Sequence, residues 1–322
     1  MKNFKLFALS QSQKLGKEVA EEIGISLGEL KLDKFSDGEL SPAFIDSIRG
    51  YDVYIIGSLH QPHDNIMEML LTIDSAKRAG ANKVNLVIPY YGYARQDRRA
   101  KSRGAIGARV LSNALKANGM DSIMIVDLHA GQIEGFFDNT SPVIHIAGKD
   151  VFIPSIKNIV DKDWVICSPD AGGVERTKKF ADILELPLIV INKRRDKPNS
   201  IGSMELVGDV SNKKVLIIDD MIDTGGSLVT ATNLLLDNGA SEVSACITHG
   251  VLSGLAYEKI GNSNLTKLYI SDTIPVKELN SSGVKFPNNI EVISCSTVLA
   301  RVISAINQNN SIENELKSII FE

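Results

Sequence analysis

The residues best suited to chemistry lie in one short segment, where two adjacent carboxylates, Asp219 and Asp220, follow the apolar run 215–218. The residues that come next are Asp223, Thr224, Gly225, Gly226 and Ser227. Paired glycines let backbone N–H groups converge on one point, and a helix that begins there adds the positive end of its dipole. Together with the hydroxyls of Thr224 and Ser227, this predicts a phosphate cradle.

The acid pair needs a different partner, because carboxylates repel phosphate but accept hydrogen bonds from sugar hydroxyls. A phosphate cradle next to such an acid pair predicts a sugar 5-phosphate as the ligand. The alternative is an ordinary strand-to-helix turn with a capping aspartate, but a cap needs one acid and not this whole set.

A second candidate site is a dense cationic segment. Five cations fall within residues 95–103 of a chain whose formal net charge is −4: Arg95, Arg98, Arg99, Lys101 and Arg103. Such a run next to Gly92 and Gly104 predicts an anion site for a polyphosphate. A solvated loop is the alternative, and the acidic net charge disfavours a nucleic-acid patch.

Two further features have both a functional and a structural interpretation. Residues 193–200 carry four cations and a proline with no apolar anchor, which predicts either a mobile loop that closes over a phosphorylated substrate or a solvated charge run. His129 follows a predicted strand and Asp127, so it is either a ligand or a structural histidine.

These residues must be positioned by a regular framework. Short β-branched runs alternate with amphipathic stretches, which predicts parallel sheets covered by helices. Strands are expected at residues 53–57, 84–89, 122–126, 143–146, 164–167, 188–191, 215–218 and 243–248. Helices are expected at 63–80 and 230–239, each closed by a glycine in the left-handed conformation. Ligands bind beyond the carboxyl ends of parallel strands, where the candidate acids lie.

Length and composition limit the class of protein. A chain of 322 residues predicts two domains, 1–148 and 149–322, with the last helix packing back on the first. The 35 basic and 39 acidic residues argue against a nucleic-acid partner. No apolar run of about 20 residues or signal-peptide pattern is present, and the three separated cysteines offer no disulfide framework. We therefore expect a cytoplasmic protein with no membrane partner.

The segment 219–227 resembles the ribose-5-phosphate loop of the type I phosphoribosyltransferase fold, and the whole chain resembles the class I ribose-phosphate pyrophosphokinases. Further matching segments are 35–39, 64–68, 89–98, 127–130, 135–138, 168–173, 193–195 and 248–250. The resemblance implies two similar α/β domains, each with a parallel sheet and helices on both faces. It also implies transfer of the β,γ-diphosphoryl group of MgATP to the anomeric hydroxyl of ribose 5-phosphate, giving 5-phosphoribosyl 1-diphosphate and AMP for nucleotide biosynthesis.

The resemblance also implies roles for individual residues. The implied ATP ligands are Phe35, Asp37, Glu39, Arg95, Gln96 and Asp97, the first three supplied by a neighbouring subunit. The implied Mg²⁺ ligands are His129 and Asp170, and the implied catalytic pair is Lys193 and Arg195. The implied ribose-5-phosphate ligands are Asp219, Asp220, Asp223, Thr224, Gly225, Gly226 and Ser227. The implied regulatory phosphate site is Ser47, Arg49, Lys101, Ser102 and Arg103. Residue type alone would place Phe35 in the core.

Shared ATP sites imply a homo-oligomer of at least two subunits, and the hexamer is the usual assembly of the family. Two segments, 139–142 and 312–322, depart from the family pattern, so the resemblance does not predict regulation by nucleotides. Two other interpretations stay open: a phosphoribosyltransferase that consumes the activated sugar, and a non-catalytic homologue that binds the active enzyme. Both fit less well, because every matched active-site position is filled and the chain is two domains long.

Overall fold

The computed structural model describes residues 3–194 and 203–321, and the chain divides into two compact units. Unit 1 comprises residues 1–147, 273–275 and 294–322, and unit 2 comprises residues 148–272 and 276–293. The first boundary thus falls between Ala147 and Gly148. Residues 294–322, which the sequence division grouped with the second half, cluster with unit 1.

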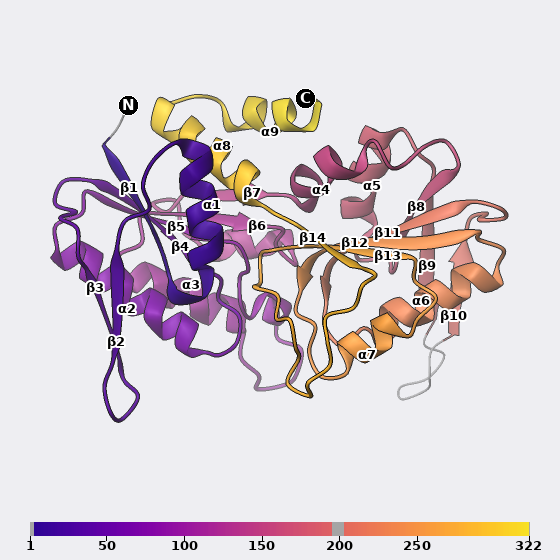
Figure 1. Cartoon of the computed structure of the whole chain (residues 1–322), viewed down its shortest axis with the longest axis horizontal. Helices are drawn as coiled ribbons and strands as arrows, with labels where there is room; N and C mark the ends of the chain where they lie inside the picture. Colours follow the sequence, from indigo (N-terminus) through magenta and orange to yellow (C-terminus); the bar gives the residue numbers. More distant parts are fainter. Residues whose placement is uncertain (1–2, 195–202, 322) are drawn as a thin grey trace. The chain divides into compact units, whose positions relative to one another are not determined.

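Unit 1 is built on a five-stranded parallel sheet in the order β1-β4-β5-β6-β7 (Figure 1). The strands are β1 (Phe4–Ala8), β4 (Asp52–Ile56), β5 (Lys83–Ile88), β6 (Ser122–Val126) and β7 (Val143–Ile146). Apolar residues run almost without interruption along β4, β5 and β6, as expected for strands covered on both faces. A separate two-stranded hairpin, β2 (Leu30–Lys34) and β3 (Leu40–Phe44), lies between β1 and β4 along the chain.

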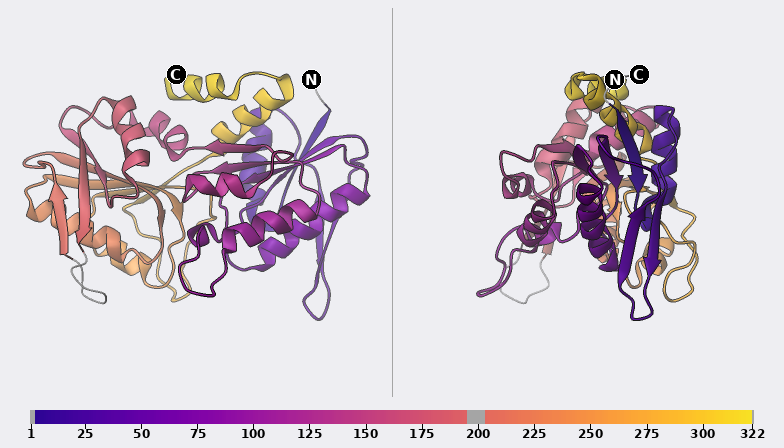
Figure 2. Two further views of the ribbon diagram at one scale, coloured as in Figure 1. Left: turned by 180° about the vertical axis from the view of Figure 1, so that it is seen from behind. Right: turned by 90° about the vertical axis from the view of Figure 1, so that its left-hand side faces the viewer.

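The helices of unit 1 cover both faces of its sheet (Figure 2). Helices α2 (Asp64–Arg78) and α3 (Gly107–Ala117) share a core with Val53 and Ile55 of β4. The side chain between these two, Tyr54, points to the other face, where its hydroxyl meets Asn307 Nδ2 at 3.2 Å. Asn307 belongs to α8 (Ser296–Gln308), which packs against α1 (Gln13–Ile23) and α9 (Ile312–Phe321).

Unit 2 contains a seven-stranded sheet in the order β10-β9-β8-β11-β12-β13-β14. Its strands are β8 (Trp164–Ser168), β9 (Leu188–Arg194), β10 (Ser203–Val207), β11 (Lys214–Ile222), β12 (Glu242–Gly250), β13 (Lys267–Ser271) and β14 (Ile290–Ile293). All neighbours are parallel except β10 and β9. Helices α6 (Gly226–Asp237) and α7 (Ala256–Gly261) lie on one face, and α4 (Gly148–Ile156) and α5 (Val174–Leu184) on the other (Figure 1).

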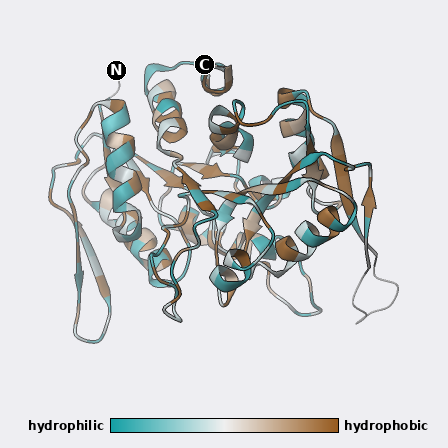
Figure 3. Ribbon diagram, turned by 45° about the vertical axis from the view of Figure 1, so that its right-hand side comes forward, coloured by the Kyte–Doolittle hydropathy of each residue, from teal (hydrophilic) through white to brown (hydrophobic). Residues whose placement is uncertain are grey.

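The predicted α/β class and all eight predicted strands are confirmed, and Gly80 and Gly239 have the expected positive φ of 83° and 93°. Hydrophobic residues concentrate on the strands of both sheets, with hydrophilic residues on the outer helix surfaces (Figure 3). Two predicted strand ends are wrong. The strand expected at 188–191 continues to Arg194 because it pairs with β10, and the strand expected at 215–218 continues to Ile222 because it pairs with β12.

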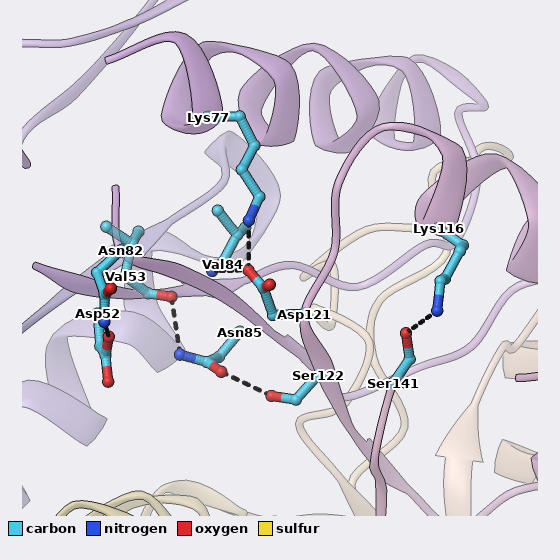
Figure 4. A network of polar contacts seen from close by, with 10 residues as sticks. All are labelled: Asp52, Val53, Lys77, Asn82, Val84, Asn85, Lys116, Asp121, Ser122 and Ser141. Atoms are coloured by element: carbon cyan, nitrogen blue, oxygen red, sulfur yellow. Dashed lines mark hydrogen bonds and ion pairs between the residues drawn. The ribbon is translucent and has the colours of Figure 1, made fainter. Parts of the chain in front are cut away.

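Polar side chains hold the amino ends of the unit 1 strands together (Figure 4). Asp121 accepts hydrogen bonds from Lys77 Nζ at 2.5 Å and from the Val84 N–H at 2.7 Å. Asn85 Oδ1 accepts a hydrogen bond from Ser122 Oγ at 2.7 Å. Because this edge lies opposite the carboxyl ends of the strands, the network stabilises the sheet and leaves the ligand-binding edge to other residues.

Neither stretch that the structure describes, 3–194 or 203–321, contains a helix long and apolar enough to cross a membrane.

Candidate active site

The acid pair lies within β11, and two residues separate it from the phosphate-type loop that begins at Asp223. The strand pairs with β12 as far as Ile222 and Gly250, so Asp219 and Asp220 belong to the strand and do not follow it as the sequence predicted. Successive strand residues point to opposite faces of the sheet. Asp219 therefore shares the face of Ile217, on which α6 and α7 pack. Asp220 faces α5.

Asp220 is buried and forms an ion pair with α5. Its Oδ1 lies 3.4 Å from a guanidinium nitrogen of Arg176, and the two side chains are 6% and 18% exposed. A buried carboxylate is costly unless it is paired, so Arg176 compensates part of the cost of placing Asp220 there.

Asp219 is the more perturbed acid of the pair. Its Oδ1 accepts a hydrogen bond from the Asp220 N–H at 2.9 Å. Burial of the carboxyl, together with repulsion from the Asp220 carboxylate, raises the pKa of Asp219. A raised carboxyl pKa at the carboxyl end of a strand is typical of a functional site, and hydroxyl donors on a ligand would relieve the cost of the charge.

The loop after β11 has the features of an anion cradle. Gly225 precedes the first residue of α6 and has a φ of 77°, in the left-handed region that favours glycine. Within the described residues no side chain caps this helix, so its first N–H groups are available to an anion. A β-carbon built on Gly226 would lie 3.9 Å from Lys259 Nζ of α7, so a cation also faces the cradle.

The loop is braced from the segment between β12 and α7. Ser253 Oγ donates a hydrogen bond to Asp223 Oδ1, and the Ser253 N–H donates to the Asp223 carbonyl at 3.0 Å. The hydroxyl-bearing residues predicted to bind phosphate, Thr224 and Ser227, are exposed. The structure thus brings all seven predicted sugar-phosphate residues into one strand end and loop, and it gives Asp223 a bracing contact as well.

Asp170 lies in the other polar loop of unit 2, between β8 and α5. Its Oδ1 accepts a hydrogen bond from the Gly173 N–H at 2.9 Å, and Ser168 Oγ donates to the Asp170 carbonyl at 2.7 Å. A β-carbon on Gly173 would lie 3.1 Å from Ser168 Oγ and would crowd this hydroxyl. One carboxylate oxygen of Asp170 therefore shapes its own loop.

In unit 1, the predicted nucleotide ligands follow β5. Arg95 and Gln96 lie in the 3-10 helix η2 (Ala94–Gln96), and Asp97 follows it. A β-carbon on Gly92 would lie 2.2 Å from the Leu59 carbonyl oxygen, so only glycine fits where the chain turns into this segment. The close approach of β4 and β5 at their carboxyl ends thus fixes the start of the predicted nucleotide loop.

A hydrogen bond that the sequence did not predict connects the segment of Asp97 to the segment that follows His129. Gln132 Nε2 donates a hydrogen bond to Asp97 Oδ2. Gln132 belongs to the 3-10 helix η3 (Gly131–Phe136), which begins two residues after His129. Nothing in the local sequence signals this bond, because it joins segments that are far apart along the chain.

The tip of the β2–β3 hairpin carries the other predicted nucleotide ligands. Phe35 is 60% exposed, so the expectation from residue type that it is a core residue is wrong. The Phe35 N–H donates to the Glu39 carbonyl at 2.9 Å, and the Glu39 N–H donates to Asp37 Oδ1 at 3.1 Å. The three residues therefore share one tight turn, which has no core of its own to cover a phenyl ring.

The predicted catalytic pair falls at the margin of the described structure. The backbone of Lys193 pairs with Met204 across β9 and β10, so the predicted irregular loop does not begin at residue 193. Arg195 lies outside the described residues.

The predicted regulatory residues lie in two segments of unit 1. Ser47 and Arg49 come between β3 and β4, and a β-carbon on Gly80 would lie 3.1 Å from a guanidinium nitrogen of Arg49. Residues 101–103 form an exposed turn, in which Arg103 has a φ of 62° and the Gly104 N–H donates to the Lys101 carbonyl at 3.0 Å. Ser102 lies in this turn.

Across the described residues no cluster of three or more His, Cys, Asp or Glu side chains could hold a metal ion by itself. Mg²⁺ commonly keeps several waters and binds one or two protein groups together with substrate phosphates.

The mostly parallel sheet, the acid pair and the glycine loop make unit 2 an α/β unit of the type I phosphoribosyltransferase fold. The family described as the N-terminal domain of ribose phosphate pyrophosphokinase matches residues 4–119, and the phosphoribosyl synthetase-associated domain matches residues 193–317. The ribose-phosphate pyrophosphokinase of Corynebacterium ammoniagenes is 46% identical over 277 residues, covering 86% of this chain and 87% of the relative. The ribose-phosphate pyrophosphokinase of Bacillus subtilis is 42% identical over 312 residues, covering 97% of this chain and 96% of the relative.

A solved structure leads to the same family. The crystal structure of phosphoribosylpyrophosphate synthetase from Mycobacterium smegmatis is 36% identical in sequence, with a TM-score of 0.87 over 96% of this chain and 100% of that one. The chain belongs to the ribose-phosphate pyrophosphokinase family.

Proposed function

We propose that this protein transfers the β,γ-diphosphoryl group of MgATP to the anomeric hydroxyl of ribose 5-phosphate, giving 5-phosphoribosyl 1-diphosphate and AMP for nucleotide biosynthesis. The anomeric oxygen bonds to the β-phosphorus, the bond from that phosphorus to the α,β-bridging oxygen breaks, and AMP leaves with that oxygen. The hydroxyl proton passes to solvent. The observation that carries the proposal is identity of 46% with a ribose-phosphate pyrophosphokinase over 86% of the chain.

The end of β11 and the loop after it bind the sugar phosphate. The phosphate lies on the N–H groups of residues 224–227 at the start of α6, where the helix dipole and Lys259 favour an anion. Asp219 and Asp220 accept hydrogen bonds from the ribose hydroxyls. Hydroxyl donors satisfy the Asp219 carboxylate, whose raised pKa reflects burial next to another acid.

Unit 1 binds the nucleotide. Arg95, Gln96 and Asp97 contact ATP, and the bond from Gln132 holds the Asp97 carboxylate in place. The exposed turn with Phe35, Asp37 and Glu39 binds adenine in a neighbouring subunit, with the phenyl ring stacked on the base and the two acids accepting its amino hydrogens.

His129 and Asp170 would hold Mg²⁺ together with the ATP phosphates. The positive charge of such an ion would neutralise charge on the diphosphoryl oxygens. One oxygen of Asp170 is already committed to the Gly173 N–H, so the other is the one that faces the ligand. Lys193 and Arg195 stabilise the charge that develops on the transferred group.

The experiment that tests the activity mixes the protein with MgATP and ribose 5-phosphate and measures AMP. We expect AMP only when the sugar phosphate is present. Absence of AMP with the sugar phosphate contradicts the proposal, and together with tight binding to a related enzyme it would indicate the non-catalytic homologue. Release of diphosphate from 5-phosphoribosyl 1-diphosphate and a nucleobase would instead indicate a phosphoribosyltransferase.

The protein works in the cytoplasm as a homo-oligomer of at least two subunits, with the hexamer as the expected assembly. Supply of Phe35 by a neighbouring subunit requires such an assembly. Light scattering should give a mass of at least twice 35.0 kDa, and a monomer in the presence of ATP contradicts the proposed assembly. A regulatory phosphate binds at a site formed by Ser47, Arg49, Lys101, Ser102 and Arg103. Measuring the activity with and without added inorganic phosphate would test this site.

A further inference from the structure

The turn that follows β6 in unit 1 has a strained backbone. Asp127 has a φ of 41°, a conformation that is unfavourable for a residue with a β-carbon, and both Asp127 and Leu128 are 3% exposed. The ladder between β6 and β7 ends where the Asp127 N–H donates to the Ile146 carbonyl at 2.7 Å. A buried, strained turn persists only where its surroundings fix it.

A histidine on β7 supplies one of the contacts that fix this turn. The Leu128 N–H donates a hydrogen bond to His145 Nε2 at 3.1 Å. On the other side of the ring, His145 Nδ1 lies 3.3 Å from Glu134 Oε1. Because Nε2 accepts a hydrogen bond, this tautomer carries the ring proton on Nδ1, the nitrogen that lies near the Glu134 carboxylate.

This arrangement links three segments through one ring. His145 lies on β7 opposite Ile125 of β6, Leu128 is in the turn, and Glu134 belongs to η3. The Glu134 carboxylate selects the tautomer that leaves Nε2 free to accept, so the ring is oriented before it binds the backbone. His129 is the next residue after Leu128, so the backbone that His145 holds is the backbone that aims His129.

We propose that His145, oriented by Glu134, is a positioning residue that fixes the turn 127–129 and thereby the side chain of His129. The consequence for nucleotide binding rests on the proposed function, in which His129 contacts MgATP. The hydrogen bond to the Leu128 N–H does not depend on it, so the two are tested separately.

The first experiment measures hydrogen exchange of the Leu128 amide by NMR. We expect His145→Leu, which removes the acceptor, to speed exchange at this amide about tenfold or more, because one hydrogen bond is lost. His145→Gln should restore protection, since its side-chain oxygen reaches as far as Nε2. Unchanged Leu128 exchange in His145→Leu overturns the proposal.

A matched control separates positioning from general loss of stability. Ile144 is half-buried on the opposite face of β7, so Ile144→Thr weakens the strand without touching the turn. We expect it to lower Tm while Leu128 exchange stays at the wild-type rate. If Ile144→Thr speeds Leu128 exchange as much as His145→Leu does, His145 has no special role. Should His145→Leu fail to fold, Glu134→Ala replaces it, because Glu134 is 46% exposed, and a smaller change in the same direction is expected.

The second experiment measures nucleotide binding by calorimetry with α,β-methylene-ATP and Mg²⁺, which needs no turnover. His145→Leu should weaken binding of the analogue about tenfold and raise the KM for MgATP, while the KM for ribose 5-phosphate stays unchanged. His145→Gln should restore the affinity for the analogue and the KM for MgATP. Equal nucleotide affinity in His145→Leu and wild type contradicts the role in positioning His129. If the wild type forms no AMP, the proposed function fails, and the Leu128 exchange result still decides whether His145 fixes the turn.

Discussion

Replacing Asp219 by asparagine should make the protein more stable and a poorer binder of ribose 5-phosphate. The amide keeps an oxygen that accepts the Asp220 N–H, which is 2.9 Å away, but it removes a negative charge from a buried site next to another carboxylate. Each unit by which folding raises the pKa of Asp219 corresponds to about 1.4 kcal/mol of destabilisation once the carboxyl is charged. Part of this energy is repulsion from Asp220, which belongs to both acids, so it is not counted in full for Asp219. We expect a gain of about 2 kcal/mol in the free energy of unfolding at neutral pH, or about 5 °C in Tm.

The pH dependence gives the sign of this effect. A carboxyl whose pKa is raised by folding binds its proton more tightly in the native state than in the unfolded chain. The wild type therefore loses stability as the pH rises from about 4, the ordinary value for aspartate, through the raised native pKa. Asparagine does not titrate. The Tm difference between Asp219→Asn and wild type should be small near pH 4 and largest near pH 8.

The binding effect has the opposite direction. Loss of a charge-assisted hydrogen bond to a ribose hydroxyl, worth about 1.5–3 kcal/mol, should raise the KM for ribose 5-phosphate about 10- to 100-fold. Asp209→Asn is the matched control, because Asp209 is exposed and hydrogen bonds from Ser211 lower its pKa, so this variant should not gain stability or change the KM. If Asp219→Asn is less stable than wild type, or if its gain in Tm does not change with pH, the Asp219 carboxylate does not destabilise the folded protein as described.

Three further substitutions have expected outcomes. Lys193→Ala should lower kcat about 10²- to 10⁴-fold with little change in the KM for MgATP, because its charge acts in the transition state, and a near-normal kcat contradicts this. Gly225→Ala should raise the KM for ribose 5-phosphate and cost about 1 kcal/mol of stability, because φ is 77° and its β-carbon would lie 3.4 Å from Ile260 Cγ1; unchanged kinetics and Tm count against the cradle. Gly92→Ala should abolish MgATP binding in calorimetry, because a β-carbon there would lie 2.2 Å from the Leu59 carbonyl oxygen and the backbone must move, and wild-type affinity would refute it.

The interior strands could be predicted because burial on both faces requires continuous apolar residues. Strands β4 to β6 are such runs, and their positions are confirmed within a residue or two. The hairpin was missed because most side chains of β2 and β3 are partly or fully exposed and Pro42 lies inside β3. Strand β10 was missed because it depends on an edge pairing with β9.

The candidate site shows the same division between local and non-local information. The acids and glycines of residues 219–227 are contiguous, so the sequence placed them together. The strand was predicted to end at residue 218 because aspartates are poor strand formers. In the structure, β11 continues through both acids because it pairs with β12. The bonds from Gln132 to Asp97 and from Leu128 to His145 join separate segments, and no local pattern could have predicted them.

A crystal structure of the protein with ribose 5-phosphate bound would test the proposed sugar-phosphate site most directly. The phosphate should lie within hydrogen-bonding distance of the N–H groups of residues 224–227, with the ribose hydroxyls on Asp219 and Asp220. A phosphate bound elsewhere, with the start of α6 left to solvent, would contradict it.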